Sequence, residues 1–548
     1  MFSSYIRGLK AEFRGYNAKI FSKDLMAGLT VTAVALPLAL AFGVSSGADA
    51  AAGLITAILA GLIIGALSGG FYQISGPTGA MAAILMSVVA KHSMQGVFVA
   101  TLLAGAILLL AGIFRLGRLI AFIPAPVITG FTSGIAVIIA LGQVDNFFGV
   151  RSEGSTAVSR LLSYGTLGFS PDWTALAIGC FVVLFMVFFP KKWSRVIPAS
   201  LLAIIAATAA SMLLSLDVPQ VGAIPQTLLP EARLSLSALS GGEVLSLLSP
   251  AFSIAMLGMI ESLLCGASAG RMTGVRLNAD QELIAQGIGN LVIPFFGGIP
   301  ATAAIARTSV AIKSGARTRV AGMIHSAGLL LSMFLLAPVM SRIPLSALAG
   351  VLMVTAWRMN EWESIRYIFS HRFKGGILKF LATMLATIVF DLTIAIGIGV
   401  FIALVLLLAR LSRLDVAVEA VDPVRAHIDS DAALRERYGR ASVVYITGPI
   451  LFSNCRTVEE LPGQLRGADT VLFSLRGVSH LDISGAQTLL ALLETLRRGG
   501  MDIVLCGVAP TAMKMMRRSG IADFVGENNF YWSVDRVLHD LRSPEHTI

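Results

Sequence analysis

Charged side chains are scarce in this 548-residue chain, at 14% of all residues, whereas hydrophobic residues make up 55%. A soluble domain usually carries about 25% charged residues. Cysteine is also rare, and Cys180, Cys265, Cys455 and Cys506 lie too far apart for a disulfide framework or a CxxC metal pair. This composition excludes an ordinary soluble enzyme and predicts a polytopic α-helical membrane protein.

The sequence also lacks a phosphate-binding glycine motif and any cluster of His, Cys and Asp typical of a catalytic or metal site. We therefore expect no enzymatic activity, no cofactor and no metal. The net charge of +10 does not indicate a nucleic-acid partner, because the basic residues stand in short clusters between apolar runs. Residues 1–23 are basic and have no apolar signal-peptide core, so they are expected to form a cytoplasmic N-terminal segment.

Apolar runs between residues 24 and 414 fit fourteen membrane spans, which form the expected transport domain. The predicted spans start near Gly28, Gly53, Thr78, Gly96, Ala121, Thr174, Ile197, Pro250, Gln281, Ala301, Val320, Pro344, Gly375 and Leu392. Cytoplasmic loops are rich in Lys and Arg. This count of spans places most basic clusters inside, whereas the outer loop 215–249 has Arg233 as its only basic residue. We predict a multi-pass membrane protein with both termini in the cytoplasm.

The long outer loop separates two halves, at about 24–215 and 243–414, with seven predicted spans each. Because seven is odd, the second half enters the membrane in the opposite direction, which is an inverted repeat.

Each half contains one short segment rich in proline, threonine and small residues: SGPTGAMAAILMSVVA from Ser75 and GGIPATAAIARTSVAI from Gly297. Both are too short to cross a bilayer alone, since a span needs about 20 residues. Pro77 and Pro300 suit the first turn of a helix, where no N–H is needed. Thr78 and Thr302 can cap these helices or donate a hydroxyl.

Two helix starts that face each other inside a membrane present free N–H groups and positive dipole ends, which suit a small anion. The predicted substrate-binding residues are Gly76, Pro77, Thr78, Gly79, Ala80, Gly298, Pro300, Ala301, Thr302 and Ala303. The alternative is that both segments are ordinary kinks with small residues at helix contacts.

Glu261 has no other charged residue within nine positions on either side, in the apolar stretch PAFSIAMLGMIESLLCGASAG. An ionisable group at such a depth is a functional candidate, and we predict that Glu261 carries a coupling proton. The alternative is a structural carboxylate bonded to backbone or to Arg307. Arg307 itself can balance Glu261, attract the anion, or reach the cytoplasmic surface. Further candidates for lining the site are Pro37, Gln73, Ser75 and Cys265.

After residue 414 the composition changes to that of a soluble domain. Residues 415–440 form a charged segment that we assign to a linker, and 441–548 alternate strand and helix patterns, which predicts a small cytoplasmic α/β domain. In the loop HLDISGAQ, Ser484 suits a helix N-cap. Its alternative role is regulatory phosphorylation, because added negative charge is tolerated at a helix N-terminus.

These segments together resemble the SulP (sulfate permease) family of anion transporters: SGPTGA at 75–80, IESLLCG at 260–266, FFGGIPATAAIARTSV at 295–310 and LDISG at 481–485. The last resembles the STAS domain, in which the serine matching Ser484 can be phosphorylated. The resemblance implies a seven-plus-seven inverted repeat with core and gate domains, a substrate site between spans three and ten, elevator-like motion and a homodimer.

The family also bears on coupling and substrate. Its sodium-coupled bicarbonate branch has Asp and Thr at the positions matching Glu261 and Cys265, so the resemblance favours H+ over Na+ here. The segments MIESLLCG and ATAAIAR look most like bacterial members associated with C4-dicarboxylate uptake, while sulfate and bicarbonate stay open.

The leading hypothesis is a proton-coupled symporter of a small anion (fumarate or succinate, sulfate, or bicarbonate), surrounded by lipid of the bacterial inner (plasma) membrane. One alternative is a nucleobase–cation symporter of the same fold. The other is a regulatory membrane protein that signals to a cytoplasmic partner through its STAS domain.

Overall fold

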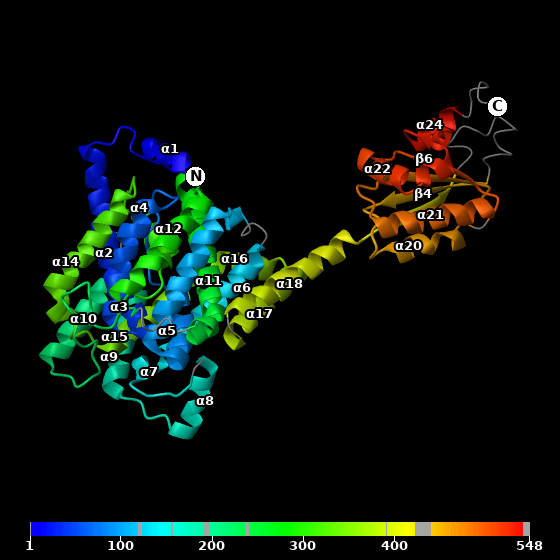
Figure 1. The fold of residues 1–548 in the computed structure, drawn as a ribbon. Helices are drawn as coiled ribbons and strands as arrows, with labels where there is room; N and C mark the ends of the chain where they lie inside the picture. Colours follow the sequence, from blue (N-terminus) through cyan, green and yellow to red (C-terminus); the bar gives the residue numbers. More distant parts are fainter. Residues whose placement is uncertain are drawn as a thin grey trace. The chain divides into compact units, whose positions relative to one another are not determined.

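The computed structural model describes residues 2–118, 123–154, 157–190, 198–235, 241–390, 392–421, 440–465 and 467–540. The basic cluster at 191–195 and most of the predicted linker lie outside the described residues. The chain divides into two compact units, Met1–Ala403 and Leu404–Ile548. The first is a helical bundle and the second contains a β-sheet (Figure 1).

The first unit consists of helices and two very short strands. Its helices are α1 (Phe2–Glu12), α2 (Ala18–Ser45), α3 (Ala50–Leu59), α4 (Gly65–Leu67), α5 (Gly79–Ile113), α6 (Ala125–Gly142), α7 (Val144–Phe148), α8 (Ala157–Leu167), α9 (Trp173–Phe188), α10 (Ala199–Leu213), α11 (Gly241–Thr273), α12 (Ala279–Val292), α13 (Ile305–Lys313), α14 (Val320–Met340), α15 (Leu345–Met359), α16 (Trp362–Ser370), α17 (Lys374–Val389) and α18 (Leu392–Leu411). The strands are β1 (Ser75–Gly76) and β2 (Thr302–Ala303), and α18 crosses the boundary to the second unit.

Most of these helices pack as two groups. In one group, α5 packs against α11 and α12, while α2 packs against α3, α13 and α14. In the other, α6 packs against α17, and α15 packs against α6, α9 and α10. Glycine permits a close crossing of α5 and α12: a Cβ on Gly105 of α5 would lie 2.7 Å from the backbone nitrogen of Leu291 in α12. We call these the α5 group and the α6 group.

Six helices in the described part of the chain are long and apolar enough to cross a membrane, and four shorter apolar helices accompany them. The predicted third and fourth spans both fall within α5, which is kinked at Ser93, where φ is 59°. The count of fourteen spans and their direction therefore remain predictions.

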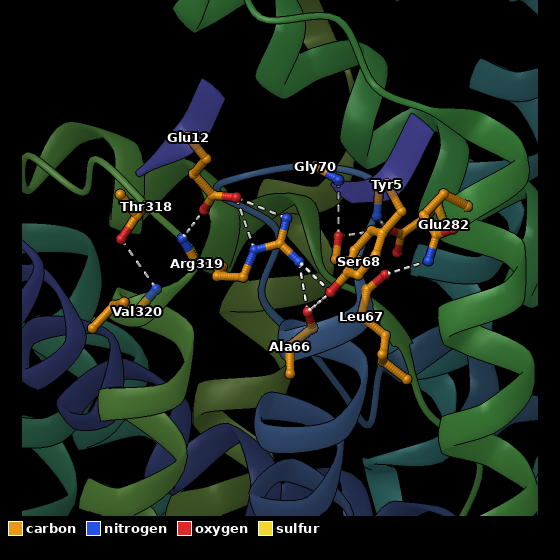
Figure 2. A network of polar contacts seen from close by, with 12 residues as sticks. Tyr5, Glu12, Ala66, Leu67, Ser68, Gly70, Glu282, Thr318, Arg319 and Val320 are labelled. Atoms are coloured by element: carbon orange, nitrogen blue, oxygen red, sulfur yellow. Dashed lines mark hydrogen bonds and ion pairs between the residues drawn. The ribbon is translucent and has the colours of Figure 1, made fainter. Parts of the chain in front are cut away.

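The N-terminal segment docks onto the α5 group through buried polar contacts (Figure 2). Glu12 of α1 forms a 2.7 Å ion pair with Arg319, the residue before α14, and both side chains are almost fully buried. Tyr5 donates a hydrogen bond to the carbonyl of Ala66 in α4. Helix α2 begins at Ala18, within the segment 1–23 that is predicted to be cytoplasmic, and the boundary of that segment stays a prediction.

The second unit contains a five-stranded sheet in the order β3-β4-β5-β6-β7. Its strands are β3 (Asp415–Ala420), β4 (Ala441–Thr447), β5 (Thr470–Gly477), β6 (Asp502–Cys506) and β7 (Phe530–Tyr531). The pair β3–β4 is antiparallel and the others are parallel. The segment predicted to be a linker thus begins as the edge strand β3. Its alternate side chains Val416 and Val418 pack against the core.

Apolar cores cover both faces of this sheet. One core joins the sheet to α20 (Cys455–Glu459), α21 (Ile483–Arg498), α22 (Pro510–Arg518) and α23 (Ile521–Val525). The other joins it to Val537 of α24 (Val534–Asp540). The small α/β domain predicted from the sequence is present.

The N-cap of α21 is Asp482, so the prediction that Ser484 caps this helix is wrong. One carboxylate oxygen of Asp482 accepts a hydrogen bond from the Gly485 amide at 2.7 Å. The other accepts one from the Phe452 amide at 2.9 Å. A serine hydroxyl has only one oxygen, whereas the aspartate carboxylate serves both amides at once.

Replacing Asp482 with alanine should destabilise this end of α21 by about 1–2 kcal/mol, the usual cost of losing an N-cap. Hydrogen–deuterium exchange on the full-length protein should show faster exchange at Gly485 and Phe452. The matched variant Ser484→Ala should leave both amides protected, and faster exchange in that variant instead would contradict the cap assignment.

Candidate anion-binding site

The two short segments singled out in the sequence lie side by side in the α5 group. Strands β1 and β2 pair antiparallel, with Ser75 opposite Ala303 and Gly76 opposite Thr302. The amide of Ala304 also donates to the carbonyl of Ile74 at 2.9 Å. Segments from the two halves of the sequence thereby form one backbone structure, with a helix leading away from each strand.

The start of α5 confirms one predicted cap. Thr78 is the N-cap of this helix, and its hydroxyl oxygen accepts a hydrogen bond from the Met81 amide. Gly79 and Ala80 form the first turn, where backbone N–H groups have no partner within the helix. Pro77 precedes the cap, so its predicted position in the first turn is wrong.

The start of α13 differs more from expectation. The helix begins at Ile305 after Ala304, and Pro300 and Thr302 both precede it, so neither belongs to its first turn and Thr302 is not its cap. The Thr302 hydroxyl instead lies 2.9 Å from the hydroxyl of Ser262 in α11.

Two buried polar side chains hold residues 299–301 in their extended path. Asn290 of α12 accepts from the amide of Ala301 at 2.8 Å and donates to its carbonyl at 2.9 Å. The Thr56 hydroxyl of α3 accepts from the amide of Ile299 at 2.7 Å, and its one hydrogen lies between the carbonyls of Ala52 and Ile299, at 2.7 and 3.0 Å. These long-range bonds explain why the helix starts late, and Gly298 and Pro300 are part of the path that they fix.

Sequence reasoning missed Asn290, Thr56 and Ser262. Each is a polar residue in a mostly apolar helix and each is buried. A polar side chain that is buried needs a hydrogen-bond partner, so the signal available in the sequence was the presence of polar residues in helices that are mostly apolar. The sequence alone does not say which backbone they bind.

Glu261 lies midway along α11 and contacts the cap of α5. The Thr78 hydroxyl donates a hydrogen bond to the Glu261 carboxylate at 2.9 Å. Thr78 is 8% exposed, and Glu261 is partly exposed rather than sealed in the protein. The predicted coupling residue therefore stands next to the predicted binding residues, and no ion pair with Arg307 is found among the described residues.

Arg307 of α13 reaches back toward the start of α5. One guanidinium nitrogen, Nη2, donates to the carbonyl of Pro77 at 2.5 Å, while Nη1 has no hydrogen-bond partner within the part of the chain that the structure describes. The side chain is only 1% exposed, so the alternative that it reaches the cytoplasmic surface is wrong. A Cβ on Gly76 would lie 2.5 Å from Nη1, so glycine at this position leaves room for the guanidinium.

The other lining candidates bond within the protein framework. Gln73 donates to the carbonyl of Ser262 at 2.6 Å, and the Ser75 hydroxyl accepts from Gln286 at 3.0 Å. The Cys265 thiol donates to the Thr308 hydroxyl at 3.2 Å. Pro37 is buried within α2. A role of these four residues in lining the site stays a prediction.

An interrupted backbone at matched places in two halves, with an ionisable residue beside it in an apolar helix, is the substrate-site architecture of secondary transporters. Sequence comparison assigns the family within that class. The chain belongs to the sulfate permease family, whose model matches residues 21–409, and a STAS domain model matches residues 432–537.

Individual relatives agree with this assignment. A putative sulfate transporter of Bacillus subtilis, YvdB, is 32% identical over 96% of this chain and 98% of its own. The bicarbonate transporter BicA of a Picosynechococcus species is 30% identical over 90% of both chains.

Two solved structures share the fold. The transmembrane domain of a cyanobacterial BicA covers 70% of this chain and 99% of its own, with 30% identity and a TM-score of 0.65. The murine Slc26a9 anion transporter in its inward-facing state covers 99% of this chain and 96% of its own, with a TM-score of 0.83 at 17% identity.

Proposed function

We propose that this chain is a secondary active transporter of small anions, and that the anion binds between Thr78 and Arg307. The observation that carries the proposal is the juxtaposition of an unpartnered guanidinium nitrogen, a helix N-cap hydroxyl and the Glu261 carboxylate. The sulfate and bicarbonate transporters among its relatives support an anionic substrate.

Glu261 is the proposed site of proton coupling. While Glu261 is ionised, its carboxylate accepts the hydrogen bond that the Thr78 hydroxyl donates, and it repels a second negative charge. Protonation removes that charge and frees the hydroxyl for the substrate. The anion then binds at Arg307 and at the backbone amides of the first turn of α5. Because the proton and the anion are bound at the same time, they cross the membrane together, as in a symporter.

The substrate class follows from the donors. A guanidinium and helix amides select negative charge and small size, which fits sulfate, bicarbonate and small dicarboxylates such as fumarate or succinate. We further propose H+ rather than Na+ coupling, elevator-like motion of the α5 group against the α6 group, a homodimer, and residence in the plasma membrane with both termini in the cytoplasm.

The family assignment favours this function over a nucleobase–cation symporter. The regulatory alternative rests on Ser484, which lies in the first turn of α21 in the second unit. Phosphorylation there would add charge beside the Asp482 carboxylate. Deleting residues 415–548 tests the regulatory alternative, because uptake that stays intact while a cytoplasmic partner is lost would support it.

Uptake by proteoliposomes under an imposed pH gradient tests the coupling. We expect an acidic exterior to accelerate uptake of the transported anion at least severalfold, because protons then move inward with the anion. Glu261→Gln should abolish this acceleration, since an amide cannot take up the proton, while Glu363→Gln, in α16, should retain it. A wild-type protein that ignores the gradient would contradict proton coupling.

A further inference from the structure

The second turn of α14 carries a fully buried histidine, His325. Neither of its ring nitrogens has a hydrogen-bond partner within the part of the chain that the structure describes. Buried polar side chains are almost always hydrogen-bonded. A buried imidazole with two unpaired nitrogens therefore indicates a contact beyond the packing of α14.

The His325 ring lies on the same side of α3 as the Arg307 guanidinium. A Cβ on Gly61, shortly after α3, would lie 3.6 Å from Cδ2 of His325. A Cβ on Gly76 would meet both Nη1 of Arg307, at 2.5 Å, and the Cα of Ala57 in α3, at 3.4 Å. Ala57 and Gly61 are four positions apart, so they share one face of the helix. The imidazole and the guanidinium are thus neighbours, and the charge of Arg307 acts on the imidazole.

The helix that faces His325 is irregular at this point. Residues Ala60–Ile64, which continue α3, form a π-helical turn, and such turns are frequent at functional sites. The Ser326 hydroxyl donates to the carbonyl of Ile58 at 2.5 Å, and the Thr32 hydroxyl of α2 lies 3.3 Å from the His325 carbonyl. These contacts hold the backbone of α14 beside the irregular turn and leave the imidazole nitrogens for another partner.

The charge of Arg307 determines what the imidazole can do. A second positive charge beside a buried guanidinium is repelled, so His325 is neutral and one of its ring nitrogens is an acceptor. Nη1 of Arg307 carries two hydrogens, and no ion pair of Arg307 is found among the described residues. A neutral acceptor orients the guanidinium without cancelling the charge that attracts an anion, which a carboxylate in the same place would do.

We propose that His325 is a positioning residue for Arg307. The two groups are neighbours but share no direct hydrogen bond, so one bridging water joins Nη1 to a ring nitrogen of His325. This bridge takes one hydrogen of Nη1 and leaves the other for the anion. The role of His325 rests on the anion contact proposed for Arg307.

Uptake kinetics of the full-length protein in proteoliposomes test this role, with whichever of radiolabelled sulfate, bicarbonate and succinate the wild type transports. His325→Leu removes the acceptor and brings no polar atom into the core, so the variant should fold. We expect its KM to rise about three- to tenfold, the usual effect of losing one hydrogen bond. Its kcat should change little, because the contact supports binding. His325→Gln, whose amide oxygen restores an acceptor, should recover most of the affinity, and Met333→Leu, also buried in α14, should match the wild type.

A double-mutant cycle connects the effect to Arg307. In the Arg307→Met background, His325→Leu should cause no further loss of kcat/KM, because the group that it positions is gone. The same loss in both backgrounds, or a wild-type KM in a folded His325→Leu protein, would overturn the positioning role alone. Wild-type kinetics in Arg307→Met would overturn the proposed anion contact, and the positioning role with it.

Discussion

Replacing Arg307 with methionine is expected to lower the kcat/KM of anion uptake about 100-fold or more. Methionine keeps most of the apolar stem but removes both the unpartnered Nη1 and the Nη2 bond to Pro77. A charged hydrogen bond contributes about 1.5–3 kcal/mol, and each 1.4 kcal/mol is tenfold. Loss of the anion contact and of the bond that positions the start of α5 together account for the size of the effect. The measurement is initial uptake rate against anion concentration in proteoliposomes.

Two further variants separate charge from packing in this experiment. Arg307→Lys retains the positive charge but lacks the forked geometry of a guanidinium, so its kcat/KM should be intermediate. Arg317→Met, at an exposed position after α13, should transport as the wild type does. A folded Arg307→Met protein with wild-type kinetics would exclude Arg307 from anion binding.

Replacing Glu12 with alanine should lower the free energy of unfolding by about 3–5 kcal/mol, the usual cost of removing one partner from a buried ion pair. The Glu12 carboxylate accepts hydrogen bonds from both the backbone amide and Nε of Arg319, at 2.6 and 2.8 Å. Its loss leaves a buried guanidinium with Ala66 and Tyr5 as its remaining partners. Denaturant titration of the protein in mixed micelles measures the change.

Two further variants serve as controls for the denaturant titration of Glu12→Ala. Glu12→Gln should cost less than alanine, because the amide oxygen still accepts a hydrogen bond from Arg319. Lys10→Ala, on the same helix but exposed, should change stability by no more than about 0.5 kcal/mol. Equal stability of the Glu12→Ala and Lys10→Ala proteins would show that the buried pair does not hold α1 in place.

The parts of the site that sequence could predict are those determined by local chemistry. Thr78 stands directly before a run of small helix-forming residues, and a threonine in that position caps the helix. Glu261 stands out because its neighbours are all uncharged. Both residues lie where the pattern placed them, and the structure adds the hydrogen bond between them.

The errors arise where distant residues determine the backbone. A proline and a threonine before an apolar stretch also suit a helix start, yet Asn290 and Thr56 hold residues 299–301 extended and delay the helix to Ile305. No local pattern reveals such partners, because they lie on other helices.

The choice of cap in the second unit has the same origin. Asp482 and Ser484 are both good N-cap residues, so a local pattern does not distinguish them. The amide of Phe452, 30 residues away in the chain, requires the second oxygen of the aspartate.

Anomalous diffraction from crystals of the full-length protein grown with selenate, an analogue of sulfate, most directly tests the claim that an anion binds at the start of α5. A selenium peak is expected within hydrogen-bond distance of the Thr78 hydroxyl and of Arg307 Nη1. Selenate that is transported, yet is found bound elsewhere with no peak between these two groups, would contradict it.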